Sequence, residues 1–216
     1  MIVVRSLLFN VLYLVWTVVA GTLLLLPMFL LPRKIVRWGP GLWAWGILGL
    51  AAVIIPLRFE VRGREFLPKG PAIIASKHQS AWETFVFHAL LVNTCYVLKR
   101  ELFYIPIVGW LMWKDGSIGI DRSKGTSALK IMIRGATKAL ANHRQVVVFP
   151  EGTRTAPGTD TPYQPGISML YQNFDVPLIP VALNSGLFWS RRRFFKQPGT
   201  IVIEFMSPMP RGFSKR

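Results

Sequence analysis

The residues best suited to chemistry lie in a short polar segment that follows an apolar run. Residues 71–75 predict a buried strand, His78 follows it, and Glu83 comes five residues after the imidazole. Ser80 and Glu83 have capping-box spacing, which predicts that a helix begins just after Ser80. A carboxylate in that first turn can hold one imidazole nitrogen and leave the other free to accept a proton. Capping alone also explains Ser80 and Glu83, so a catalytic role depends on the rest of the chain.

Two further polar segments follow predicted strands. Lys99 opens a charged cluster after the apolar run 95–98. Residues 148–155 leave a strand through a Pro and Gly turn and then present Thr153 and Arg154. A guanidinium offers a planar fork of donors suited to a phosphate. Ligands bind at strand ends in α/β sheets, although a charged surface turn explains each segment equally well when it is taken alone.

Short apolar runs alternate with helical stretches from Leu57 onward. This alternation predicts an α/β domain over residues 57–216, with a mixed, largely parallel sheet of about seven strands flanked by helices. The predicted strands are 57–62, 71–75, 95–98, 117–120, 145–149, 178–183 and 200–205, and the predicted helices are 81–92, 125–142 and 166–173.

Residues 1–56 predict a two-helix element that attaches to a membrane. Residues 6–32 carry no charge and are long enough to cross a bilayer, and a second uncharged run follows at 38–57. A cleaved signal peptide is disfavoured because the first run continues far beyond any cleavage site. A spanning hairpin would put the basic turn around Arg33 on the far side, against the positive-inside tendency. We therefore favour a pair embedded in one leaflet with this turn among the headgroups, and a single crossing by the first helix stays open.

Composition favours a lipid surface over nucleic acid. Lys and Arg total 26 against 10 for Asp and Glu, a net charge of +16, while 51% of the residues are hydrophobic. Such a charge requires a polyanionic partner, and the apolar excess makes lipid the expected one. The single cysteine, Cys95, lies in an apolar run and is expected in the core. Without a nucleophile elbow either, a covalent enzyme intermediate has no support.

Four motifs, in order, resemble those of the glycerolipid acyltransferases. The resemblance covers residues 57–205 and is strongest to the bacterial enzymes that act on 1-acyl-glycerol-3-phosphate, also called lysophosphatidic acid. One departure is visible, because Glu83 stands where the family usually has Asp. The motifs are His78-x4-Glu83, Lys99-x-Glu-Leu with Pro106-x-x-Gly109, Phe149-Pro-Glu-Gly-Thr-Arg154, and Val176-Pro-Leu-Ile-Pro-Val181.

The resemblance implies direct acyl transfer to the sn-2 hydroxyl, which makes phosphatidic acid. His78, oriented by Glu83, would act as general base, and Lys99 would stabilise the oxyanion. The acceptor's phosphate would be held by Glu151, Gly152, Thr153 and Arg154, assisted by Arg122. The acyl channel would be lined near Pro106, Gly109 and Pro180.

The resemblance also implies the partners and the location. The acyl donor would be acyl-CoA or acyl carrier protein, and the partners would be membrane lipids and lysophosphatidic acid, with no metal, other cofactor or nucleic acid. The expected site is the inner membrane, with the active site facing the cytoplasm and a monotopic or single-crossing anchor. Two alternatives stay open: an O-acyltransferase for another lyso-lipid, such as a lyso-ornithine lipid, and a non-catalytic basic membrane-binding protein.

Overall fold

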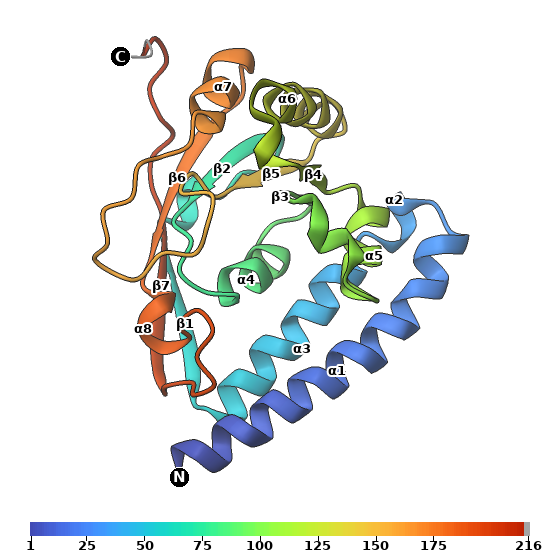
Figure 1. The fold of residues 1–216 in the computed structure, drawn as a ribbon, viewed down its shortest axis with the longest axis vertical. Helices are drawn as coiled ribbons and strands as arrows, with labels where there is room; N and C mark the ends of the chain where they lie inside the picture. Colours follow the sequence, from blue (N-terminus) through green and yellow to red (C-terminus); the bar gives the residue numbers. More distant parts are fainter. Residues whose placement is uncertain (214–216) are drawn as a thin grey trace.

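A seven-stranded sheet forms the centre of the molecule, and an N-terminal helical hairpin lies along one side of it (Figure 1). The structure is a computed structural model that describes residues 1–213. All seven predicted strands are present, with bounds that differ from the predicted ones by at most one residue. The strands are β1 (Leu57–Arg62), β2 (Ala72–Ser76), β3 (Thr94–Lys99), β4 (Ile118–Ile120), β5 (Gln145–Val148), β6 (Leu178–Leu183) and β7 (Gly199–Phe205).

The strand order is β1-β7-β6-β2-β5-β3-β4, and every pair is parallel except the antiparallel β6 and β7. The predicted mixed, largely parallel sheet is therefore confirmed. Parallel strands put their carboxyl ends at one edge. The segments after β2, β5 and β3 consequently leave the sheet side by side, and these segments carry the polar motifs.

Alternating side chains supply two cores, one on each face of the sheet. Ile74 and Val147 face the core shared with the hairpin and α4 (Trp82–Leu90). Their neighbours Ile73 and Val146 face the core under α6 and α7. These two helices, α6 (Gly125–Ala141) and α7 (Gly166–Asn173), lie where they were predicted. Three helices of the described residues were not predicted, because all three are short and α5 directly follows a Pro-containing turn: α2 (Arg33–Val36), α5 (Val108–Asp115) and α8 (Ser185–Phe188).

The N-terminal hairpin consists of α1 (Ile2–Leu30), a short α2 (Arg33–Val36) and α3 (Gly39–Ile54). Only α1, among the described residues, is both long and apolar enough to cross a membrane, with a mean hydropathy of 2.1. Only 28% of its most apolar window is buried, so most of α1 presents apolar side chains outward.

Both ends of the hairpin contact the α/β domain. Near the start of α1, the rings of Phe9 and Trp189 pack edge to face at 5.1 Å. At the other end, Arg33 Nε donates to Asp115 Oδ1 at 2.9 Å, and its Nη2 donates to Asn93 at 2.7 Å. A partly buried ion pair thus holds Arg33, in the basic turn, to the α/β domain.

Candidate active site

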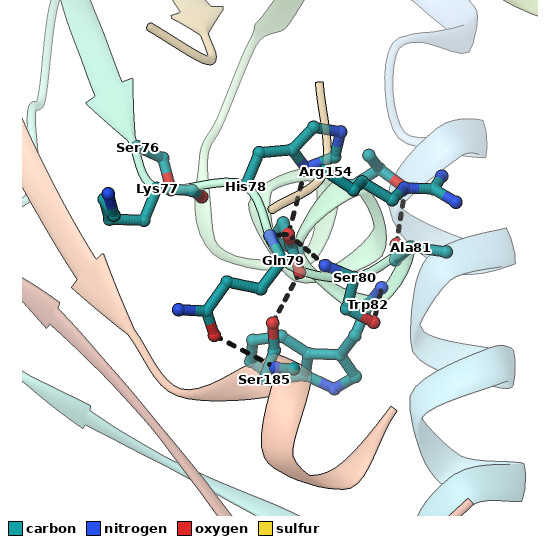
Figure 2. A network of polar contacts seen from close by, with 12 residues as sticks. Ser76, Lys77, His78, Gln79, Ser80, Ala81, Trp82, Arg154 and Ser185 are labelled. Atoms are coloured by element: carbon teal, nitrogen blue, oxygen red, sulfur yellow. Dashed lines mark hydrogen bonds and ion pairs between the residues drawn. The ribbon is translucent and has the colours of Figure 1, made fainter. Parts of the chain in front are cut away.

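His78 lies in the loop after β2 and is fixed by two neighbours. Its Nδ1 is 3.0 Å from Oε1 of Glu83, the second residue of α4. Figure 2 shows His78 in this loop, between Lys77 and Gln79. Its ring stacks on Phe149, which follows β5, with the centroids 3.9 Å apart. Because Nδ1 faces the carboxylate, Nε2 is the nitrogen left to accept a proton from a substrate. The imidazole is therefore oriented as a general base requires.

The Glu83 carboxylate is completely buried and held by several donors. Its Oε1 accepts the backbone N–H groups of Gln79 at 2.5 Å and Ser80 at 2.6 Å, and its Oε2 accepts the Ser185 hydroxyl at 2.8 Å. Ser80 Oγ in turn accepts the N–H of Trp82 at 3.1 Å, so the predicted capping contacts form, although α4 begins one residue later than expected. Glu83 thus both caps α4 and orients His78. Sequence reasoning did not identify Ser185, which lies 102 residues away in the chain.

Glu151 faces the interior, toward the loop that carries His78. It is buried, and its carboxylate contacts Lys77 Nζ at 2.5 Å, the His78 N–H at 2.8 Å and the Thr155 hydroxyl at 3.2 Å. The hydrogen bond to Glu151 is the main reason that the pKa of Lys77 is raised. A carboxylate also repels a phosphate. We therefore expect Glu151 to shape the His78 loop and not to contact the acceptor's phosphate.

The basic groups near this loop come from three parts of the chain. Arg154 is half-buried; burial lowers the pKa of its guanidinium, and the Glu83 carboxylate opposes that shift. Arg191 donates to Thr153 Oγ1 and to the Arg154 carbonyl, each at 3.2 Å. Gly152 takes a positive φ of 71°, and a Cβ there would lie 3.4 Å from an Arg122 nitrogen. Arg122 thus lies beside Gly152, while Arg191 contacts Thr153 and Arg154. The sequence signal for Arg191 was its place in a run of three arginines.

Lys99 lies apart from this cluster. It ends β3, which is separated from β2 by β5. Its side chain is 58% exposed, and its Nζ is 3.7 Å from Glu101. It shares the carboxyl edge of the sheet with His78.

Two of the predicted acyl-channel residues, Pro180 and Gly109, have different surroundings. Pro180 lines a cavity of about 470 Å³ beside Lys77 and Pro150. Gly109 is buried, and a Cβ there would lie 2.4 Å from the Leu102 carbonyl, so the Pro106–Gly109 turn packs α5 against the preceding segment. A second cavity, of about 200 Å³, lies under α6 and α7 and is bounded by Phe149 and Arg122.

Cys95 is buried in the core, as predicted. Burial raises the pKa of its thiol to about 11, which leaves it protonated and a poor nucleophile near neutral pH.

The chain is similar to proteins of one family. A family model described as Acyltransferase matches residues 58–184. The chain is 37% identical, over 93% of its length and 78% of the relative, to 1-acyl-sn-glycerol-3-phosphate acyltransferase of Pseudomonas aeruginosa. It is 32% identical to 1-acyl-sn-glycerol-3-phosphate acyltransferase alpha of Mus musculus, over 74% of this chain and 57% of the relative. The chain therefore spans little more than half of that protein. The crystal structure of the 1-acyl-sn-glycerophosphate (LPA) acyltransferase PlsC from Thermotoga maritima shares the fold, with a TM-score of 0.78, 22% identity, and coverage of 98% of this chain and 88% of that one. The chain therefore belongs to the acyltransferase family.

Proposed function

We propose that this protein transfers an acyl group from an acyl thioester to the sn-2 hydroxyl of 1-acyl-glycerol-3-phosphate and so makes phosphatidic acid. The observation that carries the proposal is the 3.0 Å contact between His78 Nδ1 and the buried Glu83 carboxylate. The names of the relatives from Pseudomonas aeruginosa and Mus musculus support the choice of acceptor.

The proposed reaction is a direct transfer without a covalent acyl-enzyme. His78 Nε2 takes the proton of the acceptor hydroxyl, and the hydroxyl oxygen attacks the thioester carbonyl. The buried Glu83 stabilises the imidazolium that forms. When the tetrahedral intermediate collapses, the carbon–sulfur bond breaks and the thiol leaves with the proton from His78. The stack on Phe149 at 3.9 Å supports this role, because it keeps the ring in one orientation.

The oxyanion and the acceptor's phosphate require separate positive groups. We assign the oxyanion to Lys99, since its exposed ammonium lies at the same sheet edge and its distance to Glu101 is a loose 3.7 Å. We assign the phosphate to Arg154, with the hydroxyl of Thr153 and the backbone of Gly152, and with Arg122 at the other side of that turn. The charge-assisted bonds of a guanidinium suit this task better than a neutral donor does.

The hairpin supports attachment to one leaflet. The contacts at Phe9 and at Arg33 hold both ends of the hairpin against the α/β domain, so neither end is free to lie across a bilayer. The outward apolar side chains of α1 and α3 would enter the leaflet. We propose a monotopic protein on the inner membrane whose active site opens to the cytoplasm. It would meet acyl-CoA or acyl carrier protein there and need no other cofactor.

An acceptor comparison tests the proposal. The purified full chain in detergent micelles would receive acyl-CoA or acyl carrier protein with lysophosphatidic acid, other lysophospholipids or lyso-ornithine lipid. We expect the highest kcat/KM for lysophosphatidic acid with either donor, because only its exposed phosphomonoester carries the charge that Arg154 suits. A preference for the unphosphorylated acceptor would contradict the proposal, and vesicle binding without any transfer would favour a non-catalytic membrane protein.

A further inference from the structure

The loop between α8 and β7 carries a basic and aromatic surface. Its sequence is Ser190-Arg191-Arg192-Arg193-Phe194-Phe195-Lys196. Phe194 is 46% exposed and Phe195 is 45% exposed, although large aromatic rings are usually buried. The three arginines are exposed as well. Arginines beside exposed aromatic rings suit the interface of an anionic membrane, where phosphates lie next to the boundary of the acyl chains.

A buried lysine holds the shape of this loop. Lys196 Nζ donates to the carbonyls of Arg193 at 3.0 Å and Phe194 at 2.9 Å, and lies 5.4 Å from the centroid of the Trp189 ring. Arg192 takes a positive φ of 59°, a conformation that is uncommon for residues other than Gly, Asn and Asp. These contacts of Lys196 stabilise the backbone of the loop, and the side chains of residues 192–195 are exposed.

The loop adjoins the amino-terminal end of α1. The backbone N–H of Lys196 donates to Ser6 Oγ at 3.0 Å, and Asn10 Nδ2 donates to the Phe194 carbonyl at 3.2 Å. Figure 1 shows α8 and the N-terminus at the same end of the molecule. Side chains of the loop and of Ile2 line a common hollow of about 260 Å³. The loop therefore extends the apolar face of α1 and adds positive charge at its edge.

The positive charge of this surface is not neutralised within the protein. No Asp or Glu occurs between Asp175 and Glu204. Among the ion pairs of residues 1–213, none involves Arg191, Arg192 or Arg193. The loop also reaches the active site, since Arg191 donates to Thr153 and to the Arg154 carbonyl.

We propose that the segment Arg191–Phe195 binds the phosphodiester headgroups of anionic phospholipids in the leaflet that holds α1. Arg192 and Arg193 contact the lipid phosphates, and Phe194 and Phe195 enter the boundary between headgroups and acyl chains. The inference rests on the proposed attachment to one leaflet. The protein would then bind anionic membranes more tightly than zwitterionic ones. Its contact with the lipid headgroups would lie directly beside the loop assigned to the acceptor's phosphate.

Vesicle flotation of the full chain tests the charge preference. Arg192→Gln/Arg193→Gln is compared with Lys130→Gln/Arg134→Gln, a matched loss of charge on exposed α6, which lies at the end of the molecule away from the N-terminus in Figure 1. Near the surface an arginine contributes about fivefold to anionic binding, so the loop variant should lose about 30-fold of the preference for phosphatidylglycerol-containing over phosphatidylcholine vesicles. The α6 variant should change by less than about twofold. Equal losses in both variants, or none in the loop variant, would overturn the proposal.

A label at the loop tests its contact with lipid separately. Cys95 is buried and burial raises the pKa of its thiol to about 11, so Phe194→Cys can be labelled selectively with an environment-sensitive fluorophore. Spin-labelled phospholipids should quench this label strongly, and should leave one at Lys130→Cys on α6 unquenched. Equal quenching at both positions would overturn the loop contact. If wild-type protein floats with phosphatidylcholine vesicles but the labelled and charge variants show no effect, the loop contact is refuted and the membrane attachment of the hairpin is not. If wild-type protein floats with neither kind of vesicle, both the loop contact and the membrane attachment are refuted.

Discussion

Glu83→Gln removes the negative charge beside His78 while nearly conserving shape. The remaining amide oxygen can still accept the N–H groups of Gln79 and Ser80, which contact Oε1 at 2.5 and 2.6 Å. The new NH₂ group then faces Ser185, whose hydroxyl now lies 2.8 Å from Oε2 and can rotate to accept. The variant should therefore fold, and its defect should be electrostatic.

The size of the effect follows from the distance between the two side chains. With Nδ1 3.0 Å from Oε1, the charge centres of an imidazolium and the carboxylate lie roughly 4 Å apart. At an effective dielectric constant of about 20, their attraction amounts to about 4 kcal/mol. This attraction exists only once His78 has taken the proton, so its loss raises the barrier. We expect kcat to fall about 10³-fold with little change in either KM.

Release of free coenzyme A from acyl-CoA, in the presence of lysophosphatidic acid micelles, gives kcat for both proteins. A thiol reagent can report this release, because Cys95 is buried. Thermal unfolding and near-UV circular dichroism of Glu83→Gln serve as controls for folding. A fall in kcat of less than about tenfold in a folded variant would refute the role assigned to Glu83.

Three further predictions address the surroundings of the dyad. Arg154→Ala should raise KM for lysophosphatidic acid about 10- to 100-fold and leave KM for acyl-CoA unchanged, because it removes charge-assisted bonds to the phosphate; a defect confined to the acyl donor would contradict that assignment. Lys77→Met should lower the free energy of unfolding, measured with denaturant, by about 1–3 kcal/mol, since it leaves buried Glu151 without its cation; unchanged stability would show that the pair is not structural. Maleimide should modify Cys95 only in unfolded protein, as followed by mass spectrometry, and rapid modification of native protein with loss of activity would contradict the buried position of the thiol.

The sheet and the dyad could be predicted because their signals are local. Apolar, β-branched runs such as Gln145–Val148 specify strands wherever they lie, and the spacing of Ser80 and Glu83 specifies a capped helix start. Because only a short turn joins the strand to the helix, His78 and Glu83 lie close enough for their side chains to contact each other. The geometry of the dyad therefore required no knowledge of distant parts of the chain.

The remaining contacts of the site join segments that are far apart in sequence. Glu151 shares a motif with Arg154, yet it accepts the N–H of His78, 73 residues away, and so faces inward. The ion pair of Arg33 was not foreseen, because its partner Asp115 belongs to α5, a helix too short to be predicted. Gly109, in the turn that begins at Pro106, packs against the Leu102 carbonyl, whereas Pro180 lines a cavity beside Lys77. Such pairings depend on tertiary packing, which local patterns do not encode.

The central claim is that His78 removes the proton of the acceptor hydroxyl. Single-turnover acyl transfer by His78→Ala, with saturating lysophosphatidic acid and acyl-CoA, tests it most directly. We expect a rate at least about 10³-fold below wild type and unchanged vesicle binding. Added imidazole should partly restore the rate by binding in the space beside Phe149, on which the His78 ring stacks at 3.9 Å in the wild type. A transfer rate within about tenfold of wild type, without imidazole, would contradict it.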